Sequence, residues 1–180
     1  MGNESLVSRR AFTKASASLG AAVGLSGIAG LSSVAAAAQQ NATSGRPEAL
    51  RSEFLMDLVL ETAPAATLGD RRIVTVPGGT FEGPRLKGRV LGPAADWTRR
   101  VADDLTILDV RLLLMTDDEQ PIYCSYRGII SRPEGGATYW RALPVFETAS
   151  PKYDWLTRIA AVAVSFTVPQ RVCYRVFEIL

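Results

Sequence analysis

The chain has 180 residues, with 20 Lys and Arg, 18 Asp and Glu, and no histidine. The absence of histidine excludes Ser-His-Asp and Cys-His catalysis, and also metal sites that depend on imidazole. The formal charge of +2 comes from the first 38 residues, so the remainder is neutral and a basic surface for nucleic acid is not expected.

The N-terminal segment has the pattern of an export signal. Residues 8–14 contain two adjacent arginines, an apolar residue two places on and then a lysine, which matches the twin-arginine signal. Residues 15–38 are uncharged and end in Ala36-Ala37-Ala38, a small-residue cleavage pattern. We expect residues 1–38 to be a signal peptide that the twin-arginine translocase reads and that is cleaved after Ala38. The protein is then periplasmic or secreted, and it meets the membrane only through this segment. An ordinary secretory leader and an uncleaved anchor are the alternatives.

The rest of the chain divides into a linker and one domain. Residues 39–52 are rich in Gln, Asn, Ser, Gly and Pro, which predicts a flexible linker. Residues 53–180 are enough for a single domain with its own hydrophobic core. Cys124 and Cys173 both lie in apolar runs of this domain. An exported protein meets oxidising conditions, so a disulfide is one alternative and two small buried core residues are the other.

Short runs of alternating apolar and polar residues, separated by turn residues, follow along the domain. They predict eight strands and, after the sixth, one short helix with a proline at its first position. The expected strands are residues 54–61, 72–76, 81–91 (irregular), 105–115, 122–130, 138–147, 159–167 and 171–179, and the expected helix is 151–160. This pattern indicates an all-β antiparallel barrel, of a size that can close around one small ligand.

Charged and aromatic residues within three of these strands are candidates for a ligand site. They are Asp109 and Arg111 on one strand, Tyr123 and Arg127 on the next, and Tyr139 and Arg141 on the third. In each strand, alternation places the candidates on one face. If these faces point inwards, the arginines suit an organic anion, because a guanidinium group matches a carboxylate. If the faces point outwards, the same side chains are solvated.

Further candidates are Trp97 and three carboxylates at other positions. Asp96 and Trp97 follow a Gly-Pro turn in an expected loop. Either Trp97 plugs one end of the barrel, or it flanks a pocket in which Asp96 is a hydrogen-bond acceptor or base. Glu147 ends a strand, and Glu82 lies in the irregular one. No spacing identifies the catalytic groups. No metal or cofactor is expected, because metal-ligand spacing and a phosphate-binding loop are both missing.

Seven short motifs follow one another along the domain in a fixed order. They are residues 78–88, Ala95-Asp96-Trp97, Leu108-Asp109-Val110-Arg111, Thr116-Asp117-Asp118, Arg141 with residues 144–148, Tyr153-Asp154-Trp155-Leu156, and Val176-Phe177-Glu178. In this order they resemble the bacterial and fungal domain-of-unknown-function family 3237, an uncharacterised protein family. The resemblance spans residues 53–180 and implies a small calycin-like β-barrel without an established general activity. The chain departs from the family at Pro93-Ala94, where a Gly-Gly pair is usual, and at residues 165–170, where the family is Gly-rich.

Three functions remain open at this stage. We expect an exported small-molecule-binding barrel whose ligand is a small, partly apolar organic acid or a phenol-like compound. The first alternative is a cofactor-independent isomerase, cyclase or lyase, in which an Asp or Glu removes a proton and Arg111 or Arg141 stabilises the resulting charge. A raised carboxyl pKa inside the cavity would favour this enzyme. The second alternative is a homo-oligomeric structural barrel with an apolar outer patch.

Overall fold

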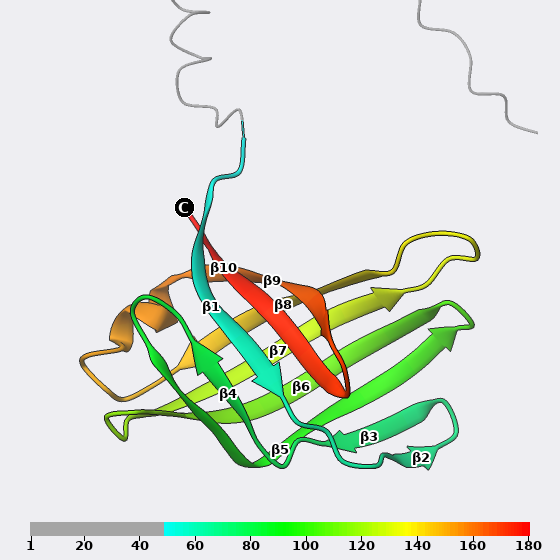
Figure 1. Ribbon diagram of the computed structural model, residues 1–180, viewed down its shortest axis with the longest axis horizontal. Helices are drawn as coiled ribbons and strands as arrows, with labels where there is room; N and C mark the ends of the chain where they lie inside the picture. Colours follow the sequence, from blue (N-terminus) through cyan, green and yellow to red (C-terminus); the bar gives the residue numbers. More distant parts are fainter. Residues whose placement is uncertain (1–48) are drawn as a thin grey trace, which may run out of the picture. The chain divides into compact units, whose positions relative to one another are not determined.

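The computed structural model describes residues 49–180, in which ten strands and one short helix follow one another (Figure 1). The strands are β1 (Ser52–Leu60), β2 (Ala66–Leu68), β3 (Arg71–Thr75), β4 (Gly79–Glu82), β5 (Lys87–Ala102), β6 (Leu105–Thr116), β7 (Pro121–Ser131), β8 (Tyr139–Glu147), β9 (Ala160–Val168) and β10 (Arg171–Ile179), and the helix is η1 (Asp154–Arg158). The expected signal peptide and most of the expected linker lie outside the described residues.

Eight of these strands form a closed antiparallel barrel. Their order is β4-β1-β10-β9-β8-β7-β6-β5, and the pairing of β5 with β4 completes the ring. Strand β5 pairs with β6 along one edge, and along the other edge with β4 and then with β3. Strands β2 and β3 therefore extend the sheet as a hairpin beside β5. The seam between β8 and β9 is short, because just two register pairs, Arg141↔Val164 and Ala142↔Ala163, join these strands.

The barrel has the expected eight strands, but they are not the same eight residue ranges that the sequence predicted. The expected strand 81–91 is divided into β4 and β5 by a turn at residues 83–86, where the N–H of Gly83 donates to the carbonyl oxygen of Leu86. Strand β5 then continues through the expected loop, so that Asp96 and Trp97 lie within a strand. The expected strand 72–76 corresponds to β3, which lies in the hairpin beside the barrel.

The helix expected over residues 151–160 was wrong. The segment contains instead the five-residue 3-10 helix η1, and the chain returns to an extended conformation at Ile159. Residues 49–180 contain no α-helix and no helix that is long and apolar enough to cross a membrane. Tyr153 and Leu156 are buried against the core, and the Arg85 guanidinium lies 3.7 Å from the ring centroid of Trp155. The segment therefore covers one end of the barrel (Figure 1).

The pleat of each strand sends one set of side chains into the barrel. In β6 these are four aliphatic residues that are each at most 1% exposed: Leu108, Val110, Leu112 and Leu114. Leu58 from β1, Phe81 from β4 and Phe146 from β8 belong to the same core cluster. Leu112 and Leu114, which lie towards the β6–β7 turn, pack with these residues, so the half of the barrel next to η1 is filled with large apolar side chains.

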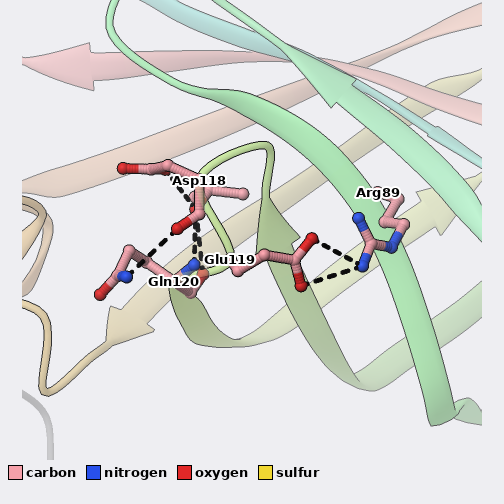
Figure 2. A network of polar contacts seen from close by, with 5 residues as sticks. Arg89, Asp118, Glu119 and Gln120 are labelled. Atoms are coloured by element: carbon pink, nitrogen blue, oxygen red, sulfur yellow. Dashed lines mark hydrogen bonds and ion pairs between the residues drawn. The ribbon is translucent and has the colours of Figure 1, made fainter.

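A polar network fixes the turn between β6 and β7 at the η1 end (Figure 2). The carboxylate of Glu119 accepts two hydrogen bonds from Nη2 of Arg89 on β5, at 3.1 and 3.2 Å. The carboxylate of Asp118 accepts hydrogen bonds from Nζ of Lys152 at 2.7 Å and from Oη of Tyr153 at 2.8 Å. These donors hold the pKa of Asp118 well below its usual range, the bond from Lys152 contributing most. The turn is thus tied to the segment that leads into η1.

The close approach of β5 to β6 depends on Gly88, since a Cβ there would overlap the carbonyl oxygen of Met115. We expect Gly88→Ala to lower the free energy of unfolding by about 3 kcal/mol, because the two backbones must separate. Urea unfolding measures this. Gly92→Ala is the matched control, since a Cβ at Gly92 meets nothing within 4 Å. Equal unfolding free energies for the two variants would contradict the prediction.

Candidate functional site

A cavity of about 220 Å³ lies inside the half of the barrel that is remote from η1. Trp140, at the start of β8, lines it, whereas the other end of β8 leads to η1 (Figure 1). Most of the wall is apolar, from Leu60, Val74, Val76, Leu108, Val110, Ile130, Trp140 and Val172, and the polar lining residues are Thr62, Arg72, Asp96, Thr98, Tyr126 and Arg132. The packed half of the core forms the floor, so the cavity is accessible from one end of the barrel.

Asp96 is the one acidic residue that lines this cavity. It lies on β5 opposite Val110 of β6, and the pleat turns both side chains inwards. Burial raises the pKa of Asp96 to about 6. The negative charge of Asp109 raises this pKa further. A hydrogen bond opposes the shift, because Oδ1 of Asp96 accepts the backbone N–H of Asp109 at 3.1 Å. No arginine contributes to the shift. The carboxyl group therefore gains and loses its proton close to neutral pH.

Two aromatic residues, Tyr126 and Trp140, line the cavity together with Asp96, and both contact the buried Tyr174. The indole N–H of Trp140 donates to Oη of Tyr174 at 2.7 Å, and the rings of Tyr126 and Tyr174 meet edge to face with centroids 5.5 Å apart. Burial raises the pKa of both phenols well above its usual range, and the charge of Asp96 raises both further. Tyr126, which lines the cavity directly, thus keeps its proton as a neutral hydrogen-bond donor.

The other sequence-predicted site residues lie on the outer face of the barrel. They are Trp97, Asp109, Arg111, Tyr123, Arg127, Tyr139, Arg141 and Glu147, which alternate with buried neighbours along their strands. Alternation left two orientations open for the strand residues, and the structure shows the outward one. For β6, β7 and β8 the reason is energetic, since an unpaired charge inside costs several kcal/mol and the alternate face of each of these strands is uncharged.

The outer candidates meet one another in pairs and do not meet Asp96. Nη1 of Arg111 lies 2.9 Å from Oδ1 of Asp109, and its guanidinium carbon lies 5.4 Å from the ring centroid of Trp97. The guanidinium carbon of Arg141 lies 4.9 Å from the ring centroid of Tyr139. Two open hollows lie on the barrel surface here: one of about 330 Å³ is lined by Asp109, Arg111, Tyr123 and Arg127 among others, and one of about 520 Å³ by Arg127, Tyr139 and Arg141 among others. Glu147 and Glu82, the other proposed bases, are both exposed.

Several lining residues were not predicted from the sequence, among them Arg72, Tyr126, Arg132 and Trp140, and neither was Tyr174 behind the hydrogen bond of Trp140. For Tyr126 a signal was available. Residues 122, 124, 126, 128 and 130 of β7 are all uncharged, whereas the intervening positions include Arg127. Choosing the uncharged face as the inner one would have placed Tyr126 inside and Arg127 outside.

The two cysteines are both buried and both free. Cys124 belongs to the inner core cluster, and burial raises the pKa of its thiol to about 12. Cys173 lies between Val172 and Tyr174, which face inwards, so it occupies the opposite face of β10. Within residues 49–180, no group of three or more Cys, Asp and Glu side chains is arranged to hold a metal ion.

The fold and the cavity define a small antiparallel β-barrel protein that carries one carboxyl group inside. The family described as protein of unknown function (DUF3237) matches residues 49–179, and the chain belongs to this family. This confirms the resemblance that the ordered motifs indicated.

Three relatives show how wide the family is. A UPF0311 protein of Clostridium acetobutylicum is 27% identical over 125 residues, which cover 62% of this chain and 79% of that protein. The hydroalkoxylation enzyme phnH of Penicillium herquei is 32% identical over 125 residues, which cover 67% of this chain and 77% of that protein. The crystal structure of a beta-barrel like protein from Acinetobacter baumannii has a TM-score of 0.69 and 32% identity, and covers 76% of this chain and 99% of that one.

The raised pKa of Asp96 predicts how stability depends on pH. The folded-state pKa of about 6 exceeds the ordinary value of 3.8, so the ionised carboxylate destabilises the fold above pH 6 and this cost disappears as the pH falls below 4. We expect Asp96→Asn to raise the free energy of unfolding by about 2 to 3 kcal/mol at pH 8 and by little at pH 4.

Urea unfolding of the wild type and the variant across this pH range measures the difference. Asp103→Asn is the control, because the side chain of Asp103 is fully exposed. A difference between wild type and Asp96→Asn that stays constant with pH would contradict the prediction.

Proposed function

We propose that this protein is a cofactor-independent enzyme that transfers a proton on a small, partly apolar substrate, with Asp96 as the acid–base residue. The observation that carries this proposal is a single carboxyl group with a pKa of about 6 in an otherwise mostly apolar cavity. A general acid or base works best when its pKa lies near the operating pH, and burial is a common way to tune it. Binding without turnover needs no such group.

The named activity of one relative supports this reading. The protein from Penicillium herquei is called a hydroalkoxylation enzyme, and hydroalkoxylation adds an O–H group across a C=C bond. In that reaction a C–O bond and a C–H bond form while the O–H bond and the π bond break, so the substrate is neither oxidised nor reduced. The chemistry requires one proton to leave oxygen and one to arrive at carbon. A residue such as Asp96 can accept the first proton and return it.

The cavity wall suits a phenol-like or related organic substrate. Tyr126 keeps its O–H and stands near Asp96, so it can donate a hydrogen bond to an oxygen on which negative charge develops. Trp140 and Ile130 offer an apolar surface for the body of the substrate. An eight-stranded barrel is wide enough for one small ligand, as in lipocalins. We therefore propose that the substrate binds inside the barrel, as ligands do in calycin-type barrels.

The proposal is tested by following proton transfer directly. We propose to incubate the full-length protein in D₂O with a panel of small hydroxyalkenes and enolisable ketones, such as 2-allylphenol and acetylacetone. Mass spectrometry then measures deuterium uptake and cyclised product. Asp96→Asn should lower the rate on an active compound by about 10² to 10⁴, because it removes the acid–base group. The rate kcat/KM should change with pH around 6, the pKa of Asp96.

Glu147→Gln is the matched control, since Glu147 is an exposed carboxylate on the outer face. We expect it to retain the wild-type rate. If Asp96→Asn also retained the rate, the assignment of Asp96 would be wrong. If panel compounds bound the wild type without any deuterium uptake or product, the protein would be the binding barrel that the sequence first suggested.

We further propose that the chain is exported in folded form by the twin-arginine translocase, with residues 1–38 as signal peptide, 39–52 as linker and 53–180 as the barrel domain. The paired arginines and the alanine-rich run that follows support this. We expect replacement of Arg9 and Arg10 by lysine to leave the full-length chain in the cytoplasm of a bacterial host. Cell fractionation with immunoblotting measures this, and unchanged export of the variant would contradict it.

A further inference from the structure

Three arginines from separate strands or strand ends surround one hollow at the open end of the barrel. Arg72 lies on β3, Arg100 lies on β5 and Arg132 directly follows β7. This mouth hollow has a volume of about 220 Å³, and it shares Arg72, Thr98, Ile130 and Arg132 with the cavity that contains Asp96. The two spaces are therefore adjacent parts of one site.

The backbone holds these arginines in place. The N–H of Arg100 donates to the carbonyl oxygen of Asp70 in the β2–β3 turn, and the N–H of Arg132 donates to that of Asp104 in the β5–β6 turn, both at 2.8 Å. The guanidinium carbon of Arg132 lies 6.0 Å from the ring centroid of Trp140. One arginine of the mouth hollow thus stands beside the aromatic wall of the cavity.

Positive charge exceeds negative charge at this mouth. Nη2 of Arg100 lies 3.1 Å from Oδ1 of Asp103, whereas Arg72 and Arg132 form no ion pair with any acidic residue among positions 49–180. Asp70 is the one carboxylate that lines the mouth hollow. Like charges that converge on a concave surface repel one another, and a bound anion removes this cost.

The mouth hollow lies at a distance from Asp96 that suits a small molecule. Arg72 on β3 lies opposite Thr98 of β5, and Thr98 is two residues from Asp96. One strand spacing and two residues at about 3.3 Å each therefore place the Cα atoms of Arg72 and Asp96 about 8 Å apart. Ile130 and Trp140 line the intervening wall. Arg72 and Arg132 also line the mouth hollow, which Asp96 does not line, so an anionic group bound there avoids direct contact with the carboxylate of Asp96, which would otherwise repel it.

We propose that Arg72 and Arg132 form a subsite for the carboxylate of an organic acid, whose apolar body extends along Trp140 towards Asp96. The placement of the reacting end at Asp96 rests on the function proposed above, whereas recognition of the carboxylate does not. A planar guanidinium group can donate two parallel hydrogen bonds to a carboxylate, which gives the subsite its preference for this group.

The experiment compares a carboxylate with its neutral analogue. We propose to measure binding of 4-phenylbutanoate and 4-phenylbutanamide to the full-length protein by isothermal titration calorimetry at low salt. We expect the wild type to bind the carboxylate at least tenfold more tightly than the amide. Arg72→Gln combined with Arg132→Gln should abolish this preference and leave the affinity for the amide within about twofold.

A second double variant provides a matched control. Arg71 and Arg99 pair with each other across β3 and β5 and face away from the cavity, so Arg71→Gln with Arg99→Gln removes the same amount of charge from β3 and its neighbour β5. We expect this variant to keep the carboxylate preference. Its loss there would show that net charge alone attracts the acid, and would overturn the subsite.

The subsite and the acid–base residue can fail separately. Asp96→Asn should keep the preference for the carboxylate over the amide even though it loses proton transfer. The calorimetric and the deuterium measurements therefore test the two proposals independently. The subsite proposal is overturned if the wild type binds the amide as tightly as the carboxylate. It is also overturned if the wild type binds neither compound, or if the Arg72 and Arg132 double variant keeps the preference.

Discussion

Strand β5 hydrogen-bonds to three other strands, and the closed barrel depends on this arrangement. Along one edge it pairs with β6, and along the other it pairs first with β4 and then with β3. The pairing with β4 completes the ring, while the pairing with β3 adds the hairpin at the open end. The same strand carries Asp96 into the cavity and Arg100 to its mouth. One strand therefore connects closure of the fold with the chemistry of the site.

The two ends of the barrel are built for different purposes. At the η1 end, Tyr153 and Leu156 fill the opening, and Asp118 and Glu119 anchor the adjacent turn through charged donors. The other end lacks a comparable plug among the described residues, and its cavity keeps a carboxyl group that burial makes costly to ionise. Proteins accept such local costs where they serve a function. The packed core at the η1 end thus offsets the loss of folding stability at the end that contains the cavity.

Alternation made much of the fold predictable, because it depends on neighbouring residues alone. The strands near residues 105–115, 122–130 and 171–179 could be read directly from their apolar periodicity. Strand β5 could not, since Gly92 and Pro93 normally interrupt a strand. The register shift between Leu91 and Ala95 absorbs these extra residues, so the strand continues past them. The sequence thus indicated Asp96 as a candidate site residue, but it predicted a loop at this position where the structure has a strand.

The site was harder to predict than the fold, because it joins residues that are far apart in the chain. Arg72 and Arg132 are separated by 60 positions, and neither stands in a motif that suggests a ligand. Only the barrel order brings β3 and the end of β7 to one mouth. Arg111, Arg127 and Arg141 have more conspicuous settings in the sequence, yet the pleat turns them outwards. Charge within an apolar strand identifies a face, while closure of the ring decides which face is inside.

The short seam between β8 and β9 has a consequence for motion. Two register pairs join these strands, whereas β7 and β8 share nine, as do β9 and β10. Fewer cross-strand bonds must break for the sheet to part here than at those two neighbouring seams, and local opening draws on the least protected elements first. Trp140, which lines the cavity, lies on β8 next to this seam. The backbone amide protons along the β8–β9 seam should therefore exchange with solvent through local opening of the barrel wall, without global unfolding.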